Sequence, residues 1–321
     1  MTRVLIIQTP VKVVKRLFCD ILRNMIIGID LGGTKILTAL ADSKGRMISS
    51  VQVDTQAALG PEKVIANIIK SISLVAKQAG IPLSRVSRVG IGAPGPILGR
   101  AIIVSPPNLP GWVNVNIKSI LHRKLKKKIY VENDANAAAL GELLFGAGKG
   151  FRNLVYITLS TGIGGGIIIK GKPYTGSIGT AGEVGHMVID QKGPKCGCGN
   201  RGCLEALASG PAIAKMAGRK NALEAELAAR RGNKRAQKAI NTAAKYIGIG
   251  IANINNILNP DIFVIGGGVS NMGRLLLDPV KSWARKYSME ASRKSLIIVP
   301  AKLKGNAGVM GAIAVCLKGD E

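Results

Sequence analysis

The sequence predicts an α/β protein whose two halves are similar and face each other across a central cleft. Each half opens with an apolar strand, a glycine-rich turn and a returning strand, first over residues 26–40 and again over residues 154–169. Apolar runs and amphipathic segments then alternate, which is typical of helices packed on a largely parallel sheet. Ligands commonly bind where two such halves meet, so the cleft is the expected functional site.

The first half is bounded by clear turn and capping residues. Its elements are expected as strands at 25–31, 36–41, 47–53, 86–92 and 128–132 and as helices at 61–79 and 135–144. The tetrapeptide Asp-Ser-Lys-Gly at 42–45 is a hairpin signal between the second and third strands. Pro61 at the start and Gly80 after the end delimit the first helix.

The second half repeats this opening and then continues with helices. Its elements are expected as strands at 154–159, 166–169, 261–265 and 296–299, a glycine turn at 160–166, and helices at 235–258 and from about residue 307 onward. We therefore divide the chain into an extension of unassigned role (1–24), a small α/β domain (25–131 with 307–321) and a large α/β domain (132–306) that carries a cysteine-rich loop.

Length and composition fit a protein of two domains. The chain has 321 residues, 47% of them hydrophobic, which is enough for two separate cores. No apolar run is long enough to span a bilayer, and the stretch 4–7 is too short for a secretory signal, so we expect a cytoplasmic protein without membrane contact. Residues 1–24 are either a weak amphipathic leader or lie upstream of a true start at Met25.

The formal charge of +27 raises the question of nucleic-acid binding. The basic residues are spread along the chain, however, and aromatic residues make up only 3% of it, so platforms for base stacking are scarce. We therefore consider nucleic acid an unlikely partner and expect a solvated basic surface, which also suits anionic substrates such as nucleotides.

A loop between residues 182 and 205 has the composition of a metal site. It holds one histidine and three cysteines within eighteen residues, namely His186, Cys196, Cys198 and Cys203. Three thiolates and one imidazole are the ligands of a closed, structural zinc site. Interleaved glycines and polar residues argue against ordinary core cysteines, and an odd total of five cysteines argues against a disulfide framework. A zinc ion here would fix Glu183 and Glu205 near each other.

Two glycine loops occupy equivalent places in the two halves. Their candidate phosphate-binding residues are Gly32, Gly33, Thr34 and Lys35 in the first loop and Thr161, Gly162, Gly164 and Gly165 in the second. Backbone N–H groups of such turns can cradle phosphate oxygens, and Asp30 at the strand end could hold a magnesium-bound water. Each loop alone could be a plain β-turn, and neither has the Walker A pattern, but two copies facing one cleft favour phosphate. Gly267 and Gly268 could let a ligand lie against backbone or could serve helix packing.

Asp134 joins a strand to a helix and has two possible roles. It could cap the helix N-terminus, which is the commonest use of aspartate at such a position. It could also accept the proton of an alcohol that attacks a phosphoryl group. The spacing alone leaves both roles open.

Taken together, these motifs resemble the ROK group of repressors, open reading frames and sugar kinases. The resemblance covers residues 25 to about 317 and is carried by DLGGTK at 30–35, GAPGP at 92–96, PNLPGW at 107–112, END at 132–134, STGIGGG at 160–166, EVGH at 183–186 and CGCGNRGCLE at 196–205. The cysteine signature with the upstream E-x-G-H is the most distinctive of these motifs, whereas the glycine loops alone would not identify the group.

The resemblance implies an actin-like ATPase fold of the hexokinase and ribonuclease H-like type, and transfer of the ATP γ-phosphoryl group to a hexose hydroxyl. It implies that Asp134 is the catalytic base and that the glycine loops hold phosphates, with Gly267 and Gly268 by the adenosine. It further implies structural Zn²⁺, Mg²⁺ with ATP, and a homo-oligomer, either dimer or tetramer. The residues that match sugar contacts are Asn108, Asn133, Asp134, Glu183, His186 and Glu205.

Glucose is the expected hexose because the E-x-G-H, PNLPGW and C-L-E elements resemble the glucokinases of the group. Mannose, fructose and N-acetylhexosamines stay open as acceptors, and polyphosphate stays open as a donor. A sugar-responsive repressor is less favoured, because only 24 residues precede Met25 and these are too few for a helix-turn-helix domain. A sugar-binding protein without catalysis is disfavoured by Asp30, Asp134 and the two loops.

Overall fold

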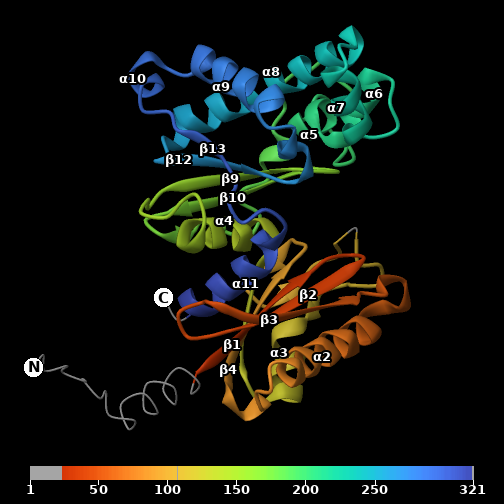
Figure 1. The fold of residues 1–321 in the computed structure, drawn as a ribbon, viewed down its shortest axis with the longest axis vertical. Coiled ribbons are helices and arrows are strands. Elements are labelled where there is room, and N and C mark those ends of the chain that lie inside the picture. Colours follow the sequence, from red (N-terminus) through yellow and green to blue (C-terminus); the bar gives the residue numbers. More distant parts are fainter. Residues whose placement is uncertain (1–23, 107, 320–321) are drawn as a thin grey trace, which may run out of the picture.

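The chain folds into two lobes, each built around a five-stranded sheet (Figure 1). The computed structural model describes residues 24–106 and 108–319. The predicted extension, apart from Asn24, lies outside the described residues, as do the last two residues of the predicted small domain. Within the described ranges, no helix has the length and apolar character needed to cross a bilayer.

The first lobe contains the sheet of order β3-β2-β1-β4-β8. Its strands are β1 (Met25–Leu31), β2 (Lys35–Ala41), β3 (Met47–Asp54), β4 (Val86–Ala93) and β8 (Lys128–Asn133). β1 is antiparallel to β2 and parallel to β4, and Asp30 lies opposite Gly92. Asp42 accepts backbone N–H bonds of 2.9 Å from Lys44 and Arg46, which closes the predicted hairpin between β2 and β3.

The second lobe contains a sheet of order β11-β10-β9-β12-β13, which matches the first sheet strand for strand. Its strands are β9 (Leu154–Leu159), β10 (Ile163–Ile169), β11 (Lys172–Pro173), β12 (Ile262–Gly266) and β13 (Ile298–Pro300). β9 is antiparallel to β10 and parallel to β12, as β1 is to β2 and β4. The predicted duplication is therefore confirmed.

The returning strand β10 begins three residues earlier than predicted, so Gly164 and Gly165, which were assigned to the turn alone, lie in the strand. The reason is close packing. A Cβ on Gly165 would lie 2.7 Å from the Gly182 carbonyl oxygen, and one on Gly166 would lie 2.8 Å from Cβ of Ala139. The turn itself is short, and Ser160 N–H donates to the Gly162 carbonyl over 2.9 Å.

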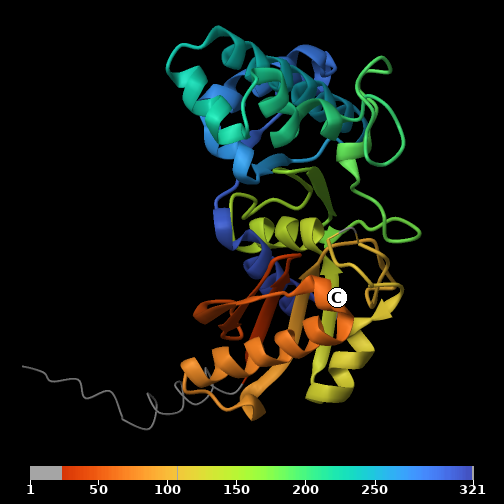
Figure 2. The ribbon, with the colours of Figure 1, turned by 90° about the vertical axis from the view of Figure 1, so that its right-hand side faces the viewer.

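Two helices, α4 (Asp134–Phe145) and α11 (Ala307–Lys318), lie between the sheets (Figures 1 and 2). α4 packs on β9 and β10, whereas α11 packs on β1 and β4. The helices contact each other through glycines, because a Cβ on Gly141 would lie 2.8 Å from the Gly311 nitrogen. Buried Glu142 accepts N–H bonds from Lys302 (3.2 Å) and Leu303 (2.8 Å), which fastens α4 to the segment that leads into α11.

The outer layers are helical. α2 (Gly60–Gln78) packs on β2 and β3 of the first sheet, in agreement with the predicted helix. The second lobe carries α5 (Leu204–Ala208), α6 (Gly210–Ala217), α7 (Ala222–Arg230), α8 (Lys234–Leu258), α9 (Arg274–Tyr287) and α10 (Glu290–Arg293). α8 agrees with the prediction to within one residue, and Asn233 caps it by accepting the Ala236 N–H over 2.9 Å.

Residues 97–106 and 108–125 form structure that the sequence analysis did not assign. A small antiparallel sheet of β5 (Ile97–Leu98), β6 (Ile102–Ile103) and β7 (Val115–Asn116) leads into α3 (Ile117–Leu125). The 3₁₀ turns are η1 (Ala57–Leu59), η2 (Leu83–Arg85), η3 (Val184–His186), η4 (Gly268–Met272) and η5 (Lys304–Asn306). Buried Trp112 anchors the segment that follows Asn108 to the core of the first lobe.

Candidate active site

The junction of β8 and α4 presents Asp134 between the lobes. The side chain of Asn133 accepts N–H bonds from Ala135 (3.0 Å) and Asn136 (3.2 Å), so Asn133 is the N-cap of α4. Asp134 is the first residue of the helix, and its Oδ1 lies 2.7 Å from the Ala135 nitrogen. The capping role left open by the sequence therefore belongs to Asn133, which leaves Asp134 available for chemistry.

Asp134 has the electrostatic properties of a base that works near neutral pH. Solvent reaches its side chain, but protein surrounds it closely, and this desolvation raises the pKa of Asp134 to about 6. The negative charges of Asp30 and Glu183 also raise it, whereas the Ala135 N–H opposes the shift. Burial likewise raises the pKa of Asp30, against the lowering effect of Lys35. The charges of Asp30 and Glu183 are therefore close enough to influence the protonation of Asp134.

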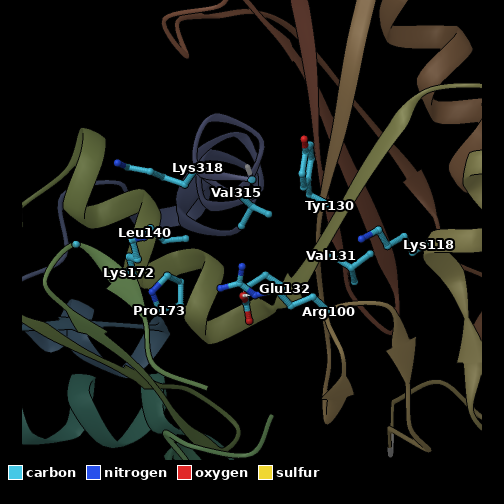
Figure 3. Close-up of a pocket in the computed structure, with 12 residues that line it drawn as sticks. Arg100, Lys118, Tyr130, Val131, Glu132, Leu140, Lys172, Pro173, Val315 and Lys318 are labelled. Carbon is cyan, nitrogen blue, oxygen red and sulfur yellow. Dashed lines mark ion pairs between the residues drawn. The ribbon is translucent and has the colours of Figure 1, made fainter. Parts of the chain in front are cut away.

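Buried Glu132 holds the junction in place. Its Oε1 accepts hydrogen bonds from the Asn133 N–H (3.1 Å) and from Nδ2 of Asn136 (3.2 Å). Its Oε2 lies 3.6 Å from Nε of Arg100 (Figure 3). Burial raises the pKa of Glu132, and the bonds from Asn136 and Asn133 and the charge of Arg100 counteract this. Sequence reasoning missed Glu132 and Arg100, because only the fold brings the β5–β6 turn to this strand.

The first glycine loop joins β1 to β2 and is held at both ends. Gly32 N–H donates to the Lys35 carbonyl over 3.0 Å, and Oγ1 of Thr55 donates to the Gly32 carbonyl over 2.7 Å. A Cβ on Gly33 would lie 2.8 Å from the Asn108 carbonyl oxygen, so the loop and the Asn108 segment are in contact. The predicted phosphate and sugar residues of the first lobe thus lie side by side.

The second loop is tied to the cysteine-rich segment. Oε2 of Glu205 accepts the Ile163 N–H over 2.9 Å, and the Ser160 carbonyl accepts the Gly210 N–H over 2.8 Å. Gly267 packs on the Leu159 backbone with φ of 82°, a conformation that favours glycine. Of the predicted phosphate residues here, exposed Thr161 and half-buried Gly162 lie in the turn, whereas Gly164 and Gly165 lie within β10.

The four predicted metal ligands converge. The candidate ligand atoms of His186, Cys196, Cys198 and Cys203 all lie within 4.8 Å of one another. Sγ of Cys196 lies 3.7 Å from Nδ1 of His186, and Sγ of Cys198 lies 3.6 Å from Sγ of Cys203. Tetrahedral bonds of usual Zn–S and Zn–N length would place sulfur atoms about 3.8 Å apart and sulfur and nitrogen about 3.6 Å apart. The cluster therefore fits zinc, and the sulfur separation is too long for a disulfide.

The two ring nitrogens of His186 have different neighbours. Nδ1 of His186 points to the cysteines, while Nε2 lies 4.0 Å from the Glu183 carboxylate. A metal bound at Nδ1 would leave a proton on Nε2 and so a hydrogen-bond donor beside Glu183. One ring can thus serve a metal and a polar ligand together.

A cavity of about 810 Å³ opens on the second lobe beside the second glycine loop. Ser160, Thr161 and Gly268 line one part of it. The remainder comes from α6, the α6–α7 connection, α7 and η4 and includes Pro211, Lys215, Arg219, Lys220, Asn271 and Met272. The sequence analysis missed these residues because nothing in an ordinary helical pattern shows which face will line a cavity.

Comparisons with known proteins agree with this geometry. The ROK family model matches residues 26–318. A glucokinase of Thermotoga maritima is 36% identical over 310 residues, which cover 90% of this chain and 96% of that protein. A xylose repressor of Caldicellulosiruptor bescii is 34% identical and matches 91% of this chain but 78% of its own length.

Among solved structures, a ROK family glucokinase from Streptomyces griseus in complex with glucose and AMPPNP superposes with a TM-score of 0.77. It is 34% identical and matches 91% of this chain and 98% of its own. A ROK hexokinase from Thermus thermophilus has a TM-score of 0.80 at 34% identity, with 92% and 99% covered. The predicted actin-like, two-domain fold is confirmed, and the chain belongs to the ROK family.

Proposed function

We propose that this protein is an ATP-dependent glucokinase that transfers the γ-phosphoryl group of ATP to the 6-hydroxyl of glucose. The observation that carries the proposal is the placement of Asp134, whose pKa is raised to about 6, at the lobe junction near Asp30 and Glu183. The glucokinase relatives and the solved complex with glucose and AMPPNP support it.

In the proposed reaction, the 6-hydroxyl oxygen attacks the γ-phosphorus as the bond from that phosphorus to the ADP oxygen breaks. Asp134 accepts the hydroxyl proton, and its near-neutral pKa suits a group that must be ionised before the step and protonated after it. The Glu132 hydrogen bonds hold the segment that carries Asp134. Positioning of this kind is the main protein contribution to phosphoryl transfer.

The sugar would lie between Asn108 of the first lobe and the cysteine-rich segment of the second. A hexose is a ring of hydroxyls, so the amides and carboxylates here would pair with it as donors and acceptors. Besides Asp134, the proposed contacts are Asn108, Asn133, Glu183, His186 and Glu205. Nδ2 of Asn133 stays available because the cap uses only its oxygen.

Zn²⁺ is proposed at the cluster of His186 and the three cysteines, where it would act structurally. It would link η3, which follows Glu183, to α5, which begins one residue before Glu205. Four protein ligands leave no position for a reactive water. Reduced thiols are required for this site, which supports the proposed cytoplasmic location.

The nucleotide would span the two glycine loops and the cavity of the second lobe. Gly32, Gly33, Thr34, Lys35, Thr161, Gly162, Gly164 and Gly165 are the proposed phosphate residues. Gly267 and Gly268 would flank the adenosine, and Asp30 would orient water on the Mg²⁺ that accompanies ATP. Lys215 and Arg219 at the cavity edge would add positive charge.

A coupled assay of ADP release across glucose, mannose, fructose and N-acetylhexosamines tests the proposal, with ATP and polyphosphate as alternative donors. We expect the highest kcat/KM with glucose and ATP. Absence of turnover with every hexose would overturn the kinase assignment, and a salt-sensitive complex with operator DNA would then favour a repressor. The dimer or tetramer expected from the family resemblance stays a prediction.

A further inference from the structure

Thr55, the residue directly after β3, holds two carbonyl groups of the first glycine loop. Its backbone N–H donates to the Thr34 carbonyl over 2.9 Å, and its Oγ1 donates to the Gly32 carbonyl over 2.7 Å. Thr55 is fully buried, so both carbonyls point toward the interior of the first lobe. One side chain outside the loop therefore sets the orientation of two of its peptide groups.

The bond from the Thr55 hydroxyl also determines where the Gly33 N–H points. The peptide between Gly32 and Gly33 is trans, so its C=O and N–H groups point in opposite directions. Because the carbonyl points to a buried threonine, the Gly33 N–H points away from the core. Over residues 24–106 and 108–319, this N–H finds no protein acceptor. It is a backbone donor of the kind that binds phosphate oxygens.

A buried amide on α2 holds Thr55 in turn. Nδ2 of Asn67 lies 3.1 Å from the Thr55 carbonyl oxygen, 3.2 Å from that of Asp54 and 3.1 Å from Oε1 of Gln56. Asn67 belongs to the otherwise largely apolar buried face of α2, where an amide without hydrogen-bond partners would reduce stability. Its partners are the segment 54–56, which connects α2 to the glycine loop.

A second buried threonine in the same lobe makes a comparable bond with no contact to the loop. Oγ1 of Thr38 on β2 lies 2.7 Å from Oγ of Ser71 on α2, and both side chains are fully buried. This bond joins the sheet to the helix. The two threonines thus have equal burial and equally short hydroxyl bonds, but Thr55 alone of the two holds the loop.

We propose that Thr55 is a positioning residue for phosphoryl transfer, which orients the Gly33 N–H toward a phosphate oxygen of the bound nucleotide. Asn67 contributes by holding Thr55. The loop is then ordered before the nucleotide binds, so less conformational freedom is lost on binding, and the donor needs no reorientation. This inference rests on the proposed function, because it takes the first loop as a phosphate site.

The substitution Thr55→Val tests the role, since valine keeps the branched shape and lacks the hydroxyl. The Gly32 carbonyl loses its partner, and the peptide that carries the Gly33 N–H can rotate. We expect the affinity of the full chain for AMPPNP with Mg²⁺, measured by isothermal titration, to fall about tenfold, as for one charge-assisted hydrogen bond. KM for ATP should rise by a similar factor, whereas glucose affinity without nucleotide should be unchanged. Thr55→Ser keeps the hydroxyl and should restore both values.

The matched control is Thr38→Val, which also removes a buried hydroxyl with a partner at 2.7 Å in the first lobe. It should lower the Tm about as much as Thr55→Val does and leave the AMPPNP affinity at the wild-type value. Equal losses of nucleotide affinity in the two variants, or no loss in Thr55→Val, would overturn the positioning role. So would a rise in the KM for glucose that matches the rise in the KM for ATP.

Asn67→Ala is a second test, which applies even if Thr55→Val does not fold. It should weaken AMPPNP binding, and its effect should not add to that of Thr55→Val in the double variant, because both act on the same loop contact. Unchanged AMPPNP affinity in Asn67→Ala, or additive losses, would overturn the proposed link through Thr55.

An ADP-release assay on the wild type distinguishes the two proposals. Wild-type turnover with unchanged kinetics in Thr55→Val would overturn the role of Thr55 alone. AMPPNP binding without turnover of any hexose would overturn the kinase assignment, and the AMPPNP titrations would still decide the role of Thr55. A wild-type chain that does not bind AMPPNP would overturn both.

Discussion

The carboxylate of Glu205 accepts a hydrogen bond of 2.9 Å from the backbone N–H of Ile163, at the point where the second glycine turn enters β10. Glu205 lies on α5, two residues after Cys203, which is a ligand of the proposed zinc site. One carboxylate thus joins the proposed sugar-binding segment to the proposed phosphate loop. The two binding sites share a wall, so a change on either side is expected to affect both substrates.

The substitution Gly162→Ala should disturb this shared wall. A Cβ on Gly162 would overlap Oε2 of Glu205, so the carboxylate must move away from the Ile163 N–H. We expect KM for glucose and for ATP to rise by about tenfold each, the effect of losing one or two polar contacts. Steady-state kinetics measures this. Gly305→Ala is the control, because no atom lies within 4 Å of its Cβ; an equal effect there would contradict the assignment.

Asp134→Asn should abolish turnover and spare sugar binding. An amide keeps the shape of the carboxylate but cannot accept the hydroxyl proton, and general-base catalysis is worth about 10²–10⁴ in rate. Calorimetry with glucose should show an affinity within a few-fold of the wild-type value. Asp278→Asn, at an exposed position on α9, provides the control. Near-normal turnover of the Asp134 variant would remove Asp134 from the base role.

The pH dependence of turnover follows from the raised pKa of Asp134. The base must be ionised, and its pKa is about 6, so kcat/KM should fall about tenfold per pH unit below 6 and level off above it. An aspartate with the ordinary pKa would place this fall in kcat/KM near pH 4. The negative charge of Asp30 helps to raise the pKa of Asp134, so Asp30→Asn should move the fall in kcat/KM to lower pH. The same variant should also weaken magnesium-dependent turnover. If kcat/KM of this variant fell at the same pH as in the wild type, the electrostatic coupling of the two carboxylates would be contradicted.

Removal of zinc should reduce sugar binding and stability together. Cys198→Ser, or a strong chelator, should lower the Tm by roughly 10 °C and weaken glucose binding, because η3 and α5 lose their common anchor. Metal analysis, thermal unfolding and calorimetry measure the three quantities. Cys316→Ala, which removes a thiol from the first lobe, should leave the metal content at one zinc per chain. Normal glucose affinity in a zinc-free sample would separate the loop from the sugar site.

The sequence revealed the repeated sheet openings because each combines an apolar strand with a glycine turn, and such a pattern is local. It also revealed the cluster of candidate metal ligands, since His186 and the cysteines are close along the chain. It did not predict β5, β6 and β7, which are strands of two residues each and too short to show a period. Their fold nevertheless matters, because their turn brings Arg100 to Glu132.

The glycines of β10 show a different limit of sequence reasoning. A run of glycines reads as a turn, yet in this chain most of the run is a strand flanked by close backbone neighbours. The need for glycine at Gly165 and Gly166 arises from residues 139 and 182, which are distant in sequence. Similarly, whether Asn133 or Asp134 caps α4 depends on where the helix begins. The boundary of a helix is hard to determine from sequence to within one residue.

The contact between Gly141 and Gly311 has a mechanical consequence. Where α4 and α11 cross, backbone meets backbone at this pair of glycines, while Leu140 of α4 and Val315 of α11 belong to one hydrophobic core. A change of crossing angle would pivot on the glycine contact and would have to repack those side chains. Asp134 lies less than two helical turns from this crossing along α4, so the contact also fixes the distance between the crossing and Asp134. A methyl group added at Gly141 or Gly311 would act as a spacer that shifts the axis of rotation.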